Sequence, residues 1–250
     1  AAGSVALMLI VVMAAGPLMR WRSDSAPKVL RRLAIPLAIG ILSLLVVRLL
    51  APDMGVLPWL GLSTALLAGT GSIAPLWKRN LLRTPLFTWG MVVAHLGVAV
   101  ALAGMAVDSA FFKERLVAVN EGETTEVGPF SVKLLSVEPI IGPNWTAIEA
   151  TMEARRGDGQ PFTLHPQARN YSTPPTDTSE AAITTHIDGQ LYAVLGKQGA
   201  DGRWQLRLWW KPLVTFIWLG GIMIALGGLL ALVGRVWRER RGVKSAETDA

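Results

Sequence analysis

The sequence predicts a polytopic α-helical membrane protein with a small β-rich external domain inserted before its last transmembrane helix. The chain has 250 residues of which 51% are hydrophobic, a composition that is too apolar for an ordinary soluble domain. Between the fourth and fifth apolar runs, residues 108–210 are more polar and their apolar residues alternate. The five runs lie at about residues 5–18, 33–50, 57–76, 87–107 and 211–234.

Run length decides which of these segments can cross a bilayer. Residues 87–107 are long enough to span the hydrocarbon as a helix, and the runs at 33–50, 57–76 and 211–234 are close to that length. Residues 5–18 are too few. The sequence opens inside this first run without the charged start of a signal peptide. We therefore expect residues 1–107 to be membrane helices of a longer protein, either a natural split subunit or a fragment.

Charge indicates the orientation of the helices. Residues 108–210 carry thirteen acids against nine bases, whereas the segments on the other side of the predicted spans are basic. By the positive-inside rule, 108–210 is external and the tail 235–250 is cytoplasmic. The excess of 24 Lys and Arg over 18 acids is thus explained by topology, and no nucleic-acid partner is needed. The basic positions are Arg20, Arg22, Lys28, Arg31, Arg32, Lys78, Arg79, Arg83, Arg235, Arg238, Arg240, Arg241 and Lys244.

The external segment reads as a β domain. Apolar and polar residues alternate over 203–210 and again over 130–134, the pattern of half-buried strands. NEGE, RRGDGQ and QGADG are turn sequences between such strands. The polar, proline-rich stretch 170–182 predicts a long loop. The run 209–211, Trp-Trp-Lys, predicts an aromatic belt at the outer interface, in preference to a base-stacking or sugar-binding site.

His95 is the strongest candidate functional residue, because it is the only ionisable group in the run 87–107. An imidazole in hydrocarbon is tolerated mainly where it faces protein, a water-filled cavity or a metal. A stripe of small residues lies about 100° away and predicts close packing of another helix. It consists of Gly90, Ala94, Gly97, Ala101 and Gly104. The side chains expected beside His95 at the edge of a pocket are Met91, Val98, Ala99 and Leu102.

Several reaction classes lack the residues they need. The chain has no cysteine, which excludes disulfides, thiol nucleophiles and zinc–thiolate sites, and no hydrolase, nucleotide or metalloprotease motif is present. We identify no catalytic residue. His165 and His186 lie in the polar external domain without a second ligand at i+3 or i+4, so we expect surface residues. A lone neutral imidazole suits one axial position on a haem iron, although a bond to a neighbouring carbonyl is an equal alternative.

The order of several blocks resembles the C-terminal third of the CcmF family, the membrane haem lyase component of bacterial cytochrome c maturation. These blocks are WGMVVAHLGVAVALAGMAVDS, HPQARNYSTPPTDTSEAAI, LYAVLG and WQLRLWWKPLVTFIWLGGIMIALGGLLAL. The resemblance implies that His95 is one axial ligand of a membrane b haem. The family's other haem-ligating histidines lie in an N-terminal part that this sequence does not contain. Pro166, Arg169 and Tyr171, the PxxRxY motif, would belong to the family's periplasmic β domain.

What the resemblance implies is covalent attachment of haem to the CxxCH thiols of apocytochrome c, with the b haem as an electron donor. The implied partners are the N-terminal part of the protein, a haem chaperone, apocytochrome delivery proteins and the lipid of the bacterial inner membrane. Arg169 and Tyr171 would contact a haem propionate or an apocytochrome segment, or else brace the predicted loop against the sheet. A membrane-anchored scaffold without haem is the alternative function. A haem transporter is weaker, because no inverted repeat or broken helix is visible.

The sequence also limits what the chain can do with haem by itself. His165 and His186 belong to the external domain, and Met91 and Met105 share one helix with His95, so none of them is expected to complete the coordination. We therefore expect the 250 residues alone to give at most a weak or five-coordinate haem complex, and to be inactive as a lyase.

Overall fold

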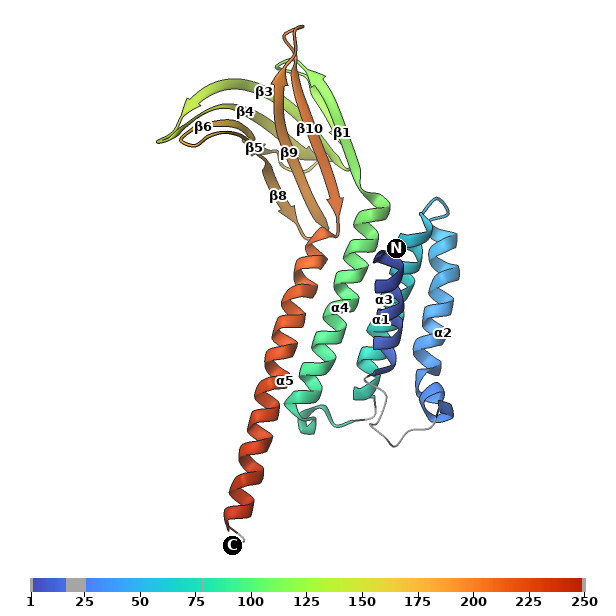
Figure 1. The fold of residues 1–250 in the computed structure, drawn as a ribbon. Helices are drawn as coiled ribbons and strands as arrows, with labels where there is room; N and C mark the ends of the chain where they lie inside the picture. The colour runs from blue at the N-terminus through green and yellow to red at the C-terminus, as the bar shows by residue number, and fades with distance from the viewer. Residues whose placement is uncertain (1, 17–25, 78, 249–250) are drawn as a thin grey trace. The chain divides into compact units, whose positions relative to one another are not determined.

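The computed structural model describes residues 2–16, 26–77 and 79–248 and confirms the predicted fold class (Figure 1). The chain divides into a helical unit and a β unit. The helical unit comprises residues 1–110 and 216–250, and the β unit comprises residues 111–215. The β unit is thus inserted between the fourth and fifth helices, as the change of periodicity predicted.

Four of the five helices are long and apolar enough to cross a membrane. The exception among the described residues is α1, whose 14 residues are too few for a span; positions 17 and 18 of the predicted run lie outside the described residues. The helices are α1 (Ala2–Ala15), α2 (Ala26–Leu50), α3 (Val56–Ile73), α4 (Leu86–Phe111) and α5 (Val214–Thr248), with short 3₁₀ helices at Ala74–Leu76 and Leu81–Arg83.

Two helices extend beyond their apolar runs. Helix α2 begins at Ala26 and takes in the basic residues before Leu33, and α5 continues to Thr248 through most of the segment assigned to a tail. Lys, Arg, Glu and Ala are good helix formers, so a helix does not stop where its hydrophobicity stops. An i,i+4 ion pair on α5, Arg235 Nε to Glu239 Oε1 at 3.1 Å, supports this extension.

The α4 and α5 backbones touch through small residues, as the stripe on α4 predicted. A Cβ placed on Gly97 would lie 2.7 Å from the Gly220 carbonyl oxygen, and one on Gly220 would lie 2.6 Å from the Ala101 nitrogen. Gly90 and Gly227 form a second such contact: a Cβ on Gly90 would lie 2.5 Å from the Gly227 carbonyl oxygen. Glycine is required at these positions because any side chain would meet the backbone of the other helix.

The β unit is a sandwich of two antiparallel sheets (Figure 1). The first has the strand order β1-β10-β9-β8, and the second has the order β2-β3-β4-β6-β7 with β5 paired to β4. The strands are β1 (Lys113–Val119), β2 (Thr124–Val127), β3 (Phe130–Ile141), β4 (Trp145–Arg156), β5 (Phe162–Leu164), β6 (Gln167–Ser172), β7 (Pro175–Glu180), β8 (Ala182–His186), β9 (Gly189–Gln198) and β10 (Trp204–Pro212).

The apolar core lies between the two sheets and confirms the alternation in the sequence. Its members come from the inward positions of both sheets, chiefly β3, β4, β9 and β10. Burying them is the main stabilising contribution to the sandwich. The fully buried side chains here include Phe130, Val132, Leu134, Met152, Leu191, Leu195, Leu206 and Leu208.

Trp210 corrects the prediction of an aromatic belt at 209–211. Its side chain is only 6% exposed and packs in the sandwich core against Phe130, with the ring centroids 5.2 Å apart. The alternation continues through this residue because the strand does not end until Pro212. Trp209 faces the other way and lies against Tyr192 with centroids 6.4 Å apart.

The predicted loop at 170–182 is instead a β-hairpin. Strands β6 and β7 pair in a continuous register from Gln167 opposite Glu180 to Ser172 opposite Pro175. Most side chains of β7 are exposed, so the stretch is polar although it is a strand. An edge strand with little apolar burial lacks the alternation on which the prediction depended.

An ion pair closes one end of the core. The Arg156 guanidinium lies 5.7 Å from the Trp210 ring centroid and donates to Asp188, with Nη1 2.8 Å from Oδ1. This hydrogen bond holds the pKa of the Asp188 carboxyl below its ordinary value. The pair joins the end of β4 to the turn between β8 and β9, across the two sheets.

Two neighbouring glycines of α5 provide a matched test of the helix contact. Gly220→Ala should lower the thermal unfolding midpoint of the purified chain, since an overpacked side chain costs about 1–3 kcal/mol. Gly221→Ala is the control, because nothing lies within 4 Å of a Cβ at that position. Equal midpoints for the two variants would contradict the packing described here.

Candidate functional site

The candidate site is built on α4, which packs against a different helix on each of two opposite faces. One face carries Gly90, Gly97 and Ala101 and lies against α5. This small-residue stripe therefore packs on a helix backbone, and α5 occupies the space that a cofactor would need there. The opposite face carries Ala99 and lies against α3.

The α3 contact is also made through small residues. A Cβ on Gly61 would lie 3.3 Å from the Ala106 Cβ, and one on Gly69 would lie 3.6 Å from the Ala99 Cβ. Leu102 contacts Gly61 on the same face and is 8% exposed. Ala99 and Leu102, which the sequence placed beside His95 at the edge of a pocket, are thus buried against α3.

At 100° per residue, His95 lies about 100° from Ala94 and about 20–40° from Leu102 and Ala99, and thus on the side of α4 that faces α3. Its side chain is half-buried. Met91 and Val98 lie at the border of this side and are half-buried, and Met105 is 47% exposed. The imidazole therefore lies on the α3-facing side of the helix, next to a more open strip that carries Met91, Val98 and Met105.

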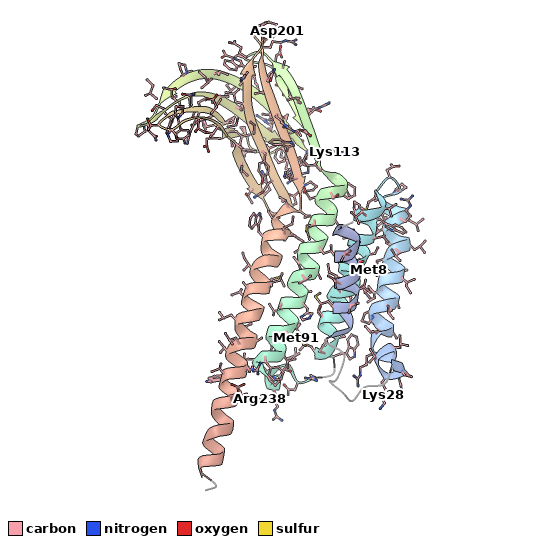
Figure 2. All side chains as sticks on the ribbon, in the orientation of Figure 1. Met8, Lys28, Met91, Lys113, Asp201 and Arg238 are labelled. Atoms are coloured by element: carbon pink, nitrogen blue, oxygen red, sulfur yellow. The ribbon has the colours of Figure 1, made fainter. Side chains whose placement is uncertain are left out.

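A hydrogen bond fixes the tautomer of His95. Its Nδ1 lies 2.8 Å from the carbonyl oxygen of Met91, one turn earlier on α4, and Figure 2 labels Met91 on that helix. A carbonyl oxygen can only accept, so the Nδ1 atom must carry the hydrogen. In the neutral ring the Nε2 atom then keeps its lone pair, and this is the form in which histidine binds a metal ion.

His95 could supply one axial ligand of a haem iron, and its surroundings on α4 offer no second one. An Nδ1–H bonded to a backbone carbonyl orients the ring. The two thioethers of α4, Met91 and Met105, belong to the same helix as His95, so they cannot approach the iron from its opposite side. Within the described residues, no group of three or more His, Asp or Glu side chains is placed to hold a metal ion directly.

Arg169 and Tyr171 lie on β6 and are engaged within the sheet. The Arg169 guanidinium lies 4.4 Å from the Trp145 ring centroid, and its Nε donates to Gln167 Oε1 at 2.7 Å. Its Nη1 is 3.4 Å from the Tyr171 hydroxyl and 3.6 Å from Glu180 Oε1. These contacts connect β4, β6 and β7, so the structure brings both predicted residues together in one cross-strand cluster.

Sequence reasoning missed Trp145 as a member of this cluster. Trp145 lies directly opposite Tyr171 in the register of β4 and β6, which places it beside Arg169. The two segments are far apart in the sequence, and a pairing between strands leaves no mark in either one alone. The alternation of polar residues at 167, 169 and 171 was the available indication that they share a face.

The two histidines of the β unit have different surroundings. His165 is exposed between β5 and β6, with its Nδ1 3.7 Å from Glu149 Oε1, as expected for a surface residue. His186 is half-buried at the end of β8, and its ring centroid lies 5.2 Å from that of Phe130. The expectation of a surface histidine is therefore wrong for His186, which packs at the border of the core.

Comparison with known proteins agrees with the fold and the sequence blocks. The family model of the CcmF C-terminal beta-sandwich matches residues 110–212. The cytochrome c-type biogenesis protein CcmF of Escherichia coli (strain K12) is 37% identical over 248 residues, which cover 96% of this chain and 38% of that protein. The chain belongs to the CcmF family and corresponds to its C-terminal part.

Other CcmF-family comparisons extend this correspondence. The cytochrome c-type biogenesis protein ccl1 of Rhodobacter capsulatus is 33% identical over 246 residues, covering 95% of this chain and 37% of that protein. A solved structure described as cytochrome c heme lyase CcmF superimposes with a TM-score of 0.76 at 23% identity, covering 92% of this chain and 39% of that one, and shows the same fold. The chain thus spans a little over a third of the length of these relatives.

Replacing Arg169 separates a bracing role from a docking role. If Arg169 braces the hairpin, Arg169→Ala should reduce the free energy of unfolding by about 1–2 kcal/mol, the range of a partly desolvated cation–π contact. Arg155→Ala, which removes an exposed arginine of β4, is the control. Unfolding by denaturant, followed by tryptophan fluorescence, measures the difference. Wild-type stability combined with slower cytochrome c maturation would indicate docking instead.

Proposed function

We propose that this chain is the C-terminal portion of a cytochrome c maturation haem lyase component and that His95 supplies one axial ligand of a b haem in the membrane. The relatives named above are cytochrome c-type biogenesis proteins, which supports the general role. The observation that carries the ligand assignment is the hydrogen bond from His95 Nδ1–H to the Met91 carbonyl, which leaves Nε2 as a donor atom.

The second axial ligand must come from outside these 250 residues. The sequence contains three histidines, and His165 and His186 belong to the β unit. An N-terminal part of the same protein is the proposed source. The chain then contributes half of a six-coordinate site, with helix α4 setting the orientation of the imidazole through its own backbone.

A bound b haem would supply one-electron reduction, which the route needs if the iron of an incoming haem is to be reduced before attachment. The contributions of this chain are ligation, orientation and exclusion of water. His95 provides the ligand atom, and the Met91 carbonyl orients the ring. The packed faces of α4 keep the helix from rotating about its axis, which would move Nε2 away from the iron.

The β unit is proposed to lie in the periplasm of a bacterium and to dock the partners of the reaction, namely a haem chaperone and apocytochrome delivery proteins. The basic residues at the start of α2, between α3 and α4, and beyond the apolar part of α5 support a cytoplasmic location for those ends. In this arrangement Arg169 and Tyr171 brace the β6–β7 hairpin, and neither acts as a catalyst.

Absorbance spectroscopy tests the ligand assignment. We expect the purified chain to bind haem weakly or in a five-coordinate form, and co-expression of an N-terminal CcmF part should convert it to a low-spin bis-histidine spectrum. His95→Ala should abolish both spectra because it removes the only histidine of the helical unit. His165→Ala, which removes an exposed imidazole of the β unit, is the control.

Two results would contradict the proposal. A low-spin bis-histidine spectrum from the isolated 250 residues would mean that the ligand set is wrong. A haem spectrum that survives His95→Ala unchanged would remove His95 from the site. If neither variant nor wild type acquires haem even with the N-terminal part present, the scaffold function without haem would be favoured.

A further inference from the structure

The turn between β8 and β9 presents an apolar side chain to its surroundings. Ile187 is 91% exposed, whereas the residues on either side of it, His186 and Asp188, are engaged with the core and with Arg156. Turns at the surface of a soluble domain normally carry Gly, Asn, Asp or Ser. An isoleucine held outward by two anchored neighbours therefore suggests an apolar environment around it.

Hydrogen bonds connect this turn to the beginning of a membrane helix. The Leu213 N–H donates to the Asp188 carbonyl oxygen at 2.8 Å, and the Thr215 hydroxyl donates to the Ile187 carbonyl oxygen at 3.3 Å. Leu213 and Thr215 flank the first residue of α5, whose stretch Val214–Glu239 is long and apolar enough to span a bilayer. The turn is thereby fixed at the level where that span begins.

The strand register places both chain connections at this same end of the four-stranded sheet. Pro212 lies opposite Gly189, and Lys113 lies opposite Trp210. Lys113 directly follows the loop from α4, and Pro212 leads into α5. Figure 2 shows Lys113 at one end of the sheet and Asp201 at the other. The 187–188 turn is thus level with the two points where the sandwich continues into membrane helices.

Amphipathic side chains surround this end of the sheet. The Lys211 ammonium lies 5.3 Å from the Tyr192 ring centroid and 5.9 Å from that of Phe112, a residue that is itself 37% exposed. Aromatic rings with a lysine among them are typical of the headgroup region of a bilayer. The sheet therefore combines an outward apolar tip with a belt that matches the chemistry of an interface.

We propose that Ile187 inserts into the interfacial layer of the bilayer beside the start of α5. The turn then forms a third anchor of the sandwich, which adds to its two covalent connections and limits its tilting on the membrane. The occupant of the exposed surface is lipid, since the turn is fixed by hydrogen bonds to the first residues of a membrane span.

Site-directed spin labelling tests this inference, because the chain contains no cysteine and needs no background substitutions. Ile187→Cys in the full chain would be labelled with a nitroxide and reconstituted in nanodiscs of phosphatidylethanolamine and phosphatidylglycerol. Collision rates with molecular oxygen, which concentrates in lipid, and with a water-soluble nickel chelate then report the depth of the label.

Ile141→Cys is the matched control, because Ile141 is 86% exposed and also lies at a turn. It is at the far end of β3 from Phe130, which contacts Trp210 beside the membrane connections. We expect the ratio of oxygen to nickel collisions to be several-fold higher at position 187 than at 141. Equal ratios would place Ile187 in water and overturn the inference. A label at 187 shielded from both reagents would also overturn it, by indicating a protein contact.

Discussion

The close approach of the α4 and α5 backbones is the contact on which the rest of the structure depends. Glycines on both helices allow it, and no larger residue fits at Gly97 or Gly220 without moving a helix. These helices are also the two connections of the sandwich to the helical unit. The contact thus pairs the two connections and fixes the face of α4 on which a ligand cannot bind.

The position of His95 follows from that constraint. With α5 packed on one face of α4, an imidazole that is to meet a cofactor must point away from that face, and His95 does so on the side that faces α3. The hydrogen bond to the Met91 carbonyl uses the helix's own backbone, so the ring needs no partner from another element to hold its tautomer. Both alternatives raised by the sequence are therefore compatible, because one nitrogen bonds a carbonyl and the other keeps its lone pair.

The sequence predicted most of the membrane part because hydrocarbon permits few solutions. A run of about twenty apolar residues must form a helix there, and a stripe of small residues must meet another backbone. The alternation in β3 and β10 was equally informative, since both strands bury one face. Prediction failed at Trp210, where a strand continued to the end of an expected belt, and at β7, whose side chains are polar on both faces.

The sequence identified individual residues of the candidate site but not the contacts between them. His95 was identifiable because it is alone among apolar residues, and Arg169 and Tyr171 were identifiable by a family motif. The Met91 contact, the position of His95 on the α3-facing side and the Trp145 partner of Arg169 all depend on the folded structure. Trp145 and Arg169 lie far apart along the chain, so no local pattern indicates that they meet, and the Met91 contact depends on how the His95 ring is oriented within one helix.

The tautomer of His95 tests most directly whether its Nε2 atom is available as a ligand. Solid-state nuclear magnetic resonance of the chain in lipid, with ¹⁵N-labelled histidine and with His165 and His186 replaced, would resolve the two ring nitrogens of His95. We expect a protonated Nδ1 and an unprotonated Nε2 in the absence of haem. A protonated Nε2 with a bare Nδ1 would contradict this expectation, because the Nε2 lone pair would then be unavailable to an iron atom.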